Sequence, residues 1–183
     1  MLNTDSQKNL PLPIRALAIL FVGVVFALLA IFMPPEDADA GANTVDNNYV
    51  FPLPSKHEYG DGFGAGRGHD GQDLFARCGR NLVAAHDGKV QRSEKDGSGY
   101  GNILVLDVKG SGIDLLYAHM QRKPIVRKGE RVNAGQKVGK VGDSGNASGC
   151  HLHFEMHTAP GFWEGGRPMR KVTDYLKSWD RRS

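Results

Sequence analysis

The segment from Gly149 to His157 constrains the fold most strongly, because its apolar and polar residues alternate. Leu, Phe and Met at positions 152, 154 and 156 are interleaved with four polar residues, His151, His153, Glu155 and His157. A period of two is typical of a β-strand with one buried face. A helix would place His153 and His157 together, as in the zinc-protease pattern His-Glu-x-x-His, but the Glu comes one position too late. The sequence therefore predicts a strand whose polar face carries potential metal ligands.

Short runs of strand-forming residues, separated by glycine-rich turns, recur between residues 80 and 160. Besides the His-rich strand they are 82–85, 89–92, 102–108, 113–119 and 137–141. The 24 glycines do not follow the collagen period, and with 8% aromatic residues they fit many tight turns between short strands. No helical pattern interrupts this series, so we predict an all-β domain with a mainly antiparallel sheet.

An apolar segment near the N-terminus, Ala16 to Met33, contains eighteen residues without a charge and follows Lys8 and Arg15. That length is sufficient for one membrane-spanning helix, with the basic residues before it in the cytoplasm. Ala38-Asp39-Ala40 also fits a signal-peptide cleavage site, so a leader removed after Ala40 is the main alternative. A buried core helix is a third reading. Both main readings place the rest of the chain outside the cytoplasm.

The net charge of +3 is too small to indicate nucleic-acid binding. Without residues 1–40 the chain keeps 21 basic and 16 acidic residues, a net charge of +5. This mild excess would suit an anionic surface such as a cell wall.

A second candidate site segment contains His69 and Asp73, four residues apart. In an extended segment both side chains lie on one face, so an imidazole and a carboxylate can reach one ion. One histidine from the later strand would complete a set of two nitrogens and one oxygen. Three protein ligands leave a position for water, which is the pattern of catalytic zinc sites. Zinc would lower the pKa of that water to about 7 and polarise a carbonyl.

Such chemistry also needs groups that move protons and stabilise an oxyanion, and imidazoles do both near neutral pH. The two candidates are His119, at the end of a predicted strand, and His151, on the same strand face as His153. Taken singly, each histidine is more commonly a surface or satisfied core residue than a functional one.

Three motifs occur in a set order: His69-x-x-x-Asp73, Tyr117-Ala118-His119 and His151-Leu152-His153-Phe154-Glu155. Together with 83–90, 99–102 and 132–139, they resemble the LytM/lysostaphin family of zinc peptidases, peptidase family M23. The resemblance covers roughly residues 60 to 160. It implies a zinc site made of His69, Asp73 and His153, with His119 and His151 assisting catalysis as base or oxyanion stabiliser.

The resemblance also implies an antiparallel β core of the duplicated-hybrid-motif type and hydrolysis of peptide bonds in peptidoglycan stems or cross-bridges. The expected organisation is a cytoplasmic N-terminus with an anchor or signal peptide (1–40), a linker (41–59), the M23-like domain (60–160) and a C-terminal segment (161–183). In that last segment, residues 172–179 are compatible with a short helix before a basic tail.

We expect the remaining histidines, Glu155 and the cysteines to lie outside the set of metal ligands and catalytic residues. Glu155 is expected to orient an imidazole from outside the ligand set, whereas His157 is expected at the groove rim or in solvent. His57 and His86 are expected to have no chemical role. For an exported domain, the only two cysteines, Cys78 and Cys150, are expected to form a disulfide.

Two functions of different classes follow. The first is a zinc endopeptidase that remodels the bacterial cell wall. The second is a non-catalytic envelope scaffold or an activator of a cell-wall amidase, which the full set of five site residues disfavours. A third interpretation is cleavage of proteins or secreted peptides that are not part of the cell wall. The sequence does not identify the scissile bond or any protein partner.

Overall fold

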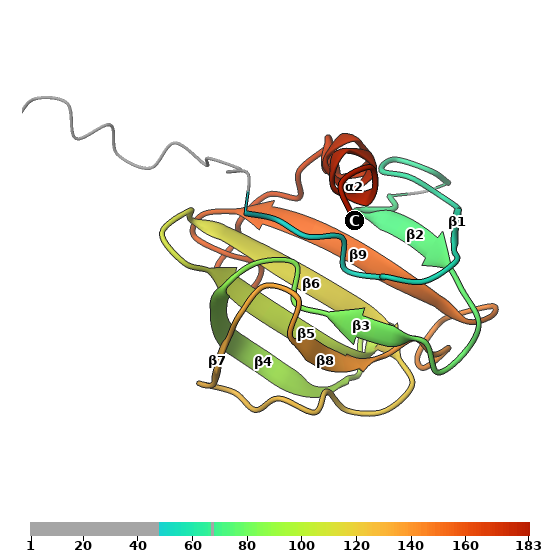
Figure 1. Ribbon diagram of the computed structural model, residues 1–183, viewed down its shortest axis with the longest axis horizontal. Coiled ribbons are helices and arrows are strands. Elements are labelled where there is room, and N and C mark those ends of the chain that lie inside the picture. Colours follow the sequence, from blue (N-terminus) through green and yellow to red (C-terminus); the bar gives the residue numbers. More distant parts are fainter. Residues whose placement is uncertain (1–47, 67) are drawn as a thin grey trace, which may run out of the picture. The chain divides into compact units, whose positions relative to one another are not determined.

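The computed structural model describes residues 48–66 and 68–183, which lie within the compact unit Gly41–Ser183 (Figure 1). The predicted N-terminal apolar helix and its cleavage site lie outside these residues. Among the described residues, no helix has the length and apolar character needed to cross a membrane. The one helix in this part of the chain is α2 (Val172–Asp180), near the C-terminus, where the sequence is compatible with a short helix.

Two antiparallel sheets form the domain, which confirms the all-β, mainly antiparallel prediction. The large sheet has seven strands in the order β1 (Glu58–Tyr59), β2 (Gln72–Phe75), β9 (His151–Thr158), β6 (Ile113–Met120), β5 (Gly101–Val108), β4 (Gly88–Asp96) and β7 (Arg131–Val132). The small sheet pairs β3 (Asn81–Val83) with β8 (Lys137–Lys140). The sequence predicts six of these nine strands, and it misses β1, β2 and β7.

Strand β9 lies inside the large sheet, hydrogen-bonded to β2 on one side and to β6 on the other. Its alternation is the predicted one, because Leu152, Phe154 and Met156 all belong to the main hydrophobic core. The four polar residues of β9 therefore face the opposite side of the sheet. This opposite face carries the candidate site.

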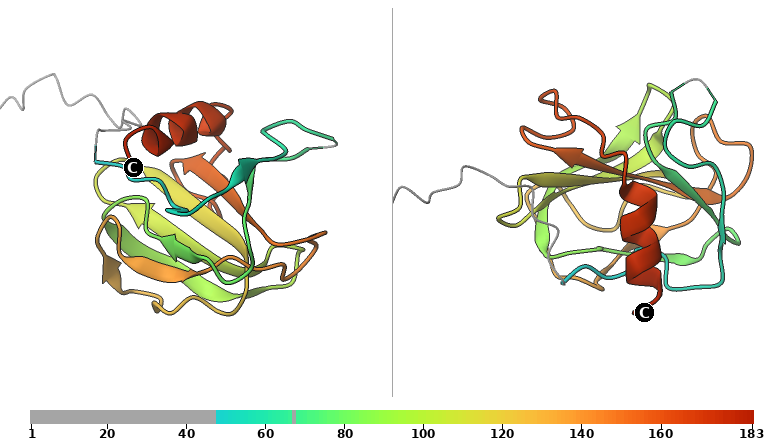
Figure 2. Two further views of the ribbon diagram at one scale, coloured as in Figure 1. Left: turned by 45° about the vertical axis from the view of Figure 1, so that its right-hand side comes forward. Right: turned by 90° about the horizontal axis from the view of Figure 1, so that it is seen from above.

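The main core fills the space on one face of the large sheet, which is covered by the small sheet and by α2 (Figure 2). Trp179 of α2 is 1% exposed and stacks on Tyr49, with ring centroids 4.6 Å apart. Phe51 and Leu53 are buried in the same core. The core thus includes residues that precede position 60 and residues that follow position 160 in the sequence. The described core residues all belong to the compact unit 41–183, and we expect this unit to fold on its own.

The expected disulfide is present and joins Cys78 to Cys150, across 72 positions of sequence. It connects the loop after β2 to the residue that precedes His151. Each of these two strands carries residues of the candidate site. The bridge therefore limits how far the two strands can separate at this end.

Two glycine turns cross beside the site, and their backbones approach more closely than side chains would allow. A Cβ on Gly101 would lie 2.4 Å from the Ser144 backbone, and one on Gly145 would lie 2.3 Å from the Gly99 carbonyl oxygen. Both glycines also have positive φ, 70° and 78°. The crossing places Ser144 next to the end of β6.

The two tryptophans provide a test of where the core lies. We expect Trp179→Ala to lower the free energy of unfolding by about 3–5 kcal/mol, because a large buried ring is lost from the core. Trp163 is 41% exposed, with Arg92 over its ring, and Trp163→Ala should cost no more than about 1 kcal/mol. Chemical denaturation of residues 41–183 measures both values. Equal losses would contradict this account of the core.

Candidate metal centre and catalytic site

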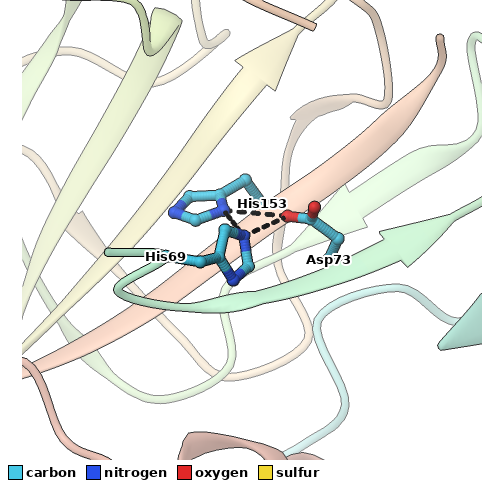
Figure 3. Close-up of side chains that lie close together, drawn as sticks. All are labelled: His69, Asp73 and His153. Atoms are coloured by element: carbon cyan, nitrogen blue, oxygen red, sulfur yellow. Dashed lines mark hydrogen bonds and ion pairs between the residues drawn. The ribbon is translucent and has the colours of Figure 1, made fainter. Parts of the chain in front are cut away.

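Three side chains from two neighbouring strands and the preceding loop converge on one point (Figure 3). Asp73 Oδ1 lies 2.8 Å from His153 Nδ1 and 3.0 Å from His69 Nε2, and the two ring nitrogens are 3.0 Å apart. The convergence follows from strand register, because Asp73 of β2 stands directly opposite His153 of β9. Within residues 48–66 and 68–183, these three side chains form the one group arranged to hold a metal ion.

The tautomers of the two histidines suit a metal ion. His69 Nδ1 lies 2.9 Å from the Gly62 carbonyl oxygen, which only accepts hydrogen bonds, so Nδ1 carries the proton and Nε2 keeps its lone pair. In His153 the roles are reversed, because Nε2 donates to Glu155 Oε1 at 2.7 Å and Nδ1 faces Asp73. Two imidazole nitrogens and one carboxylate oxygen are a donor set that zinc prefers.

Without a metal ion, hydrogen bonds between Asp73 and His153 stabilise the charged form of each side chain. Burial opposes ionisation of Asp73, but the hydrogen bond from His153 and the nearby imidazoles hold the pKa of Asp73 below its usual range. Burial likewise opposes protonation of His153, but hydrogen bonds to Asp73 and Glu155 raise its pKa to about 9. A metal ion that binds at neutral pH must therefore displace a proton from His153.

Two further imidazoles stand beside this centre, and both are residues that the sequence singles out. His119 and His151 have ring centroids 4.7 Å apart, and His151 Nε2 lies 3.7 Å from Asp73 Oδ1. Each donates its Nδ1 proton to a backbone carbonyl 2.8 Å away, that of Ser144 or Gly149. In the neutral form, each ring therefore has an unprotonated Nε2 available to act as a base.

His119 has a backbone conformation that the sequence does not reveal. Its φ is 57°, the one positive value outside glycine among the described residues. Strain of this kind is concentrated at functional sites. Two hydrogen bonds fix the backbone immediately after His119. The Ser144 hydroxyl donates to the Met120 carbonyl at 2.7 Å, and the Asn102 side-chain amide donates to the same carbonyl at 3.0 Å. Burial also lowers the pKa of His119, which favours the neutral ring.

Glu155 is fully buried behind His153 and accepts three hydrogen bonds. Its Oε1 accepts from His153 and from the Tyr100 hydroxyl at 2.9 Å, and its Oε2 accepts from His157 Nε2 at 2.5 Å. Burial would raise the pKa of Glu155, but the hydrogen bonds from His153 and His157 lower it to about 2. The carboxylate is thus placed to fix the ring of His153, which is the position that the sequence predicts for it.

The expectation for His157 was wrong. The residue is 5% exposed and contacts Glu155 instead of solvent, because the loop after β9 covers it. In that loop the Phe162 ring packs against His157, with ring centroids 4.7 Å apart, and the Gly166 carbonyl oxygen lies 3.4 Å from His157 Nδ1. Tyr100 was missed as a site residue, although its turn belongs to the motifs of the resemblance. The signal that points to it is the position of Tyr100 between two glycines.

The centre opens into a hollow of about 500 Å³. The four histidines and the aspartate that the family resemblance assigns to the site all line this hollow: His69, Asp73, His119, His151 and His153. Tyr100 and Phe75, which is 44% exposed, also line the hollow. The hollow is large enough for several residues of a peptide.

Removal of the Glu155 charge tests its role as a positioning residue. We expect Glu155→Gln to weaken zinc binding by about 10–100-fold, because the ring of His153 loses the carboxylate that orients it and raises its basicity. Competition with a chelator measures the affinity. The exposed residue Glu164 provides a matched control, and Glu164→Gln should bind zinc as the parent does. Unchanged affinity in Glu155→Gln would eliminate the role.

The model of peptidase family M23 matches residues 67–169 of this chain. Peptidoglycan DD-endopeptidase ShyC of Vibrio cholerae is 37% identical over 90 residues, which cover 49% of this chain and 20% of that protein. Murein hydrolase activator NlpD of Salmonella dublin is 34% identical over 97 residues, which cover 52% of this chain and 25% of that protein. The chain thus spans about a fifth to a quarter of the length of these relatives.

Solved structures share the fold. The catalytic domain of lysostaphin from Staphylococcus simulans matches with a TM-score of 0.60 and 27% identity, over 66% of this chain and 92% of that domain. A zinc-containing peptidase from Vibrio cholerae matches with a TM-score of 0.59 and 28% identity, over 69% of this chain and 40% of that one. The mainly antiparallel β fold is therefore lysostaphin-like.

Proposed function

We propose that this chain, which belongs to peptidase family M23, is a zinc-dependent endopeptidase that hydrolyses peptide bonds in peptidoglycan stems or cross-bridges. The observation that carries the proposal is the convergence of His69, Asp73 and His153 beside two further imidazoles. The relative named as a peptidoglycan DD-endopeptidase supports the substrate class. The disulfide and the relatives together support a location in the cell envelope, outside the cytoplasm.

The five site residues divide into two groups. His69 and His153 would each offer one ring nitrogen to the ion, and Asp73 one carboxylate oxygen. When bound, zinc would supply Lewis acidity and a water of lowered pKa. One of the two Nε2 atoms of His119 and His151 would accept the proton of the attacking water and pass it on to the departing amine nitrogen. The other ring, in its protonated form, would donate a hydrogen bond to the oxygen that becomes negative.

A non-catalytic activator is the second candidate, favoured by the similarity to murein hydrolase activator NlpD. An activator would need the groove but not a complete metal site. Here the three candidate ligands His69, Asp73 and His153 are all present. The buried carboxylate of Glu155 also accepts a hydrogen bond from His153. We therefore favour the enzyme. Hydrolysis of proteins outside the wall is a third candidate, because groove shape sets specificity.

Digestion of purified peptidoglycan by residues 41–183 tests the proposal. We expect new amine termini in the mass spectrum of the digest, and their masses will identify the bond. A chelator should abolish cleavage and added zinc should restore it. If no amine appears, but the domain stimulates a separate wall amidase, the activator is the correct function.

Variants separate metal binding from proton transfer in the same digest. His153→Ala should lose both zinc and cleavage. His119→Ala should keep zinc but lower kcat by about 10²–10⁴-fold, because a general base or oxyanion donor is lost. His57→Gln is the control, since His57 lies outside the hollow and bonds to Asp180. Full activity of a zinc-free His153→Ala sample would contradict the mechanism.

A further inference from the structure

One segment accounts for the net positive charge of residues 41–183. Residues 121–140 include seven Lys and Arg but a single acidic residue, Glu130. The other residues of 41–183 include 14 basic and 15 acidic residues, since the unit has 21 and 16. The domain is therefore close to neutral apart from this segment.

The segment folds so that several of its cations surround one hollow of about 370 Å³. Ile125 donates its backbone N–H to Val138 and Gln121 donates to Lys140, each at 3.0 Å, so the chain from 121 to 125 runs beside β8. We define the basic patch as the residues lining this hollow that carry charge or exposed apolar surface: Arg122, Lys123, Ile125, Lys137 and Lys140.

The four cations of the basic patch are exposed, and no carboxylate lines the hollow with them. Within the described residues, their side chains make no hydrogen bond or ion pair. Four unpaired like charges on one fixed surface repel one another, and an anion brought to the patch would relieve that repulsion.

Ile125 lies among these cations and is 64% exposed, the highest value for a large apolar side chain in the described part of the chain. Its backbone is fixed by the bond to Val138, and the next residue, Val126, is buried. At a bilayer surface the cations can contact lipid phosphates while an apolar side chain among them contacts the boundary between headgroups and acyl chains.

The basic patch and the candidate metal ligands belong to different layers of the domain. Val138 of β8 packs into the core that the two sheets enclose, whereas His153 of β9 lies on the face of the large sheet turned away from that core. Figure 1 shows β8 and β3 layered over one face of the large sheet. The patch is thus formed by elements other than those that supply the three candidate metal ligands.

We propose that the basic patch docks the domain on an anionic phospholipid membrane, with the four cations against lipid phosphates and Ile125 among the headgroups. A wall polyanion would satisfy the charges but would offer no apolar partner to Ile125, whereas a bilayer offers both. The apolar segment Ala16–Met33, which the sequence predicts to span a membrane, would hold the domain near such a surface.

Sedimentation with lipid vesicles tests this inference on residues 41–183, which exclude the predicted anchor. We expect binding to phosphatidylglycerol–phosphatidylcholine vesicles that falls with added salt, and little binding to phosphatidylcholine alone. The triple change Lys123→Gln, Lys137→Gln and Lys140→Gln should weaken binding on the order of 100-fold. Ile125→Ser should also weaken it, and that loss should persist when salt is varied.

A charge-matched control removes three exposed lysines outside the basic patch: Lys95→Gln, Lys109→Gln and Lys171→Gln. This control should bind vesicles nearly as the parent does. Equal binding by the two triple variants would overturn the inference, and so would patch-dependent binding to purified peptidoglycan but not to vesicles. Hydrolysis of a soluble wall peptide should be unchanged in the patch variant, so the inference and the proposed enzyme activity can fail separately.

Discussion

The pairing of β2 with β9 is the constraint on which the candidate site depends. It sets Asp73 directly opposite His153, although 80 positions of sequence separate them. A shift of one residue in this register would turn one of the two side chains into the core. Because β9 is also paired with β6, and the Cys78–Cys150 disulfide joins the ends of the two segments, the register is fixed from several sides.

The same arrangement explains how ionised groups are tolerated at a largely buried position. Burying an unpaired charge is costly, but here each charge has a hydrogen-bonded partner. Asp73 accepts from His153, which donates on its other side to Glu155, and Glu155 in turn accepts from Tyr100 and His157. The network orients the ligands from behind and leaves their metal-facing atoms toward the hollow.

The sequence predicts the parts of the fold that local pattern controls. The alternation in residues 151–157 predicts β9 and its two faces, and the turn glycines separate the longer strands. Local pattern does not predict β2, which is short and follows the glycine-rich loop 60–71, although it carries Asp73. It also cannot show that loops bury His157, or that His119 takes a positive φ, because both result from contacts distant in sequence.

Anomalous X-ray diffraction at the zinc absorption edge, from crystals of zinc-loaded residues 41–183, tests the central claim most directly. The account predicts one strong peak at about 2.0–2.2 Å from His69 Nε2, from His153 Nδ1 and from an oxygen of Asp73, with water in a remaining position. A peak at another place, or a metal ion held by a fourth protein side chain so that no position is left for water, would contradict it.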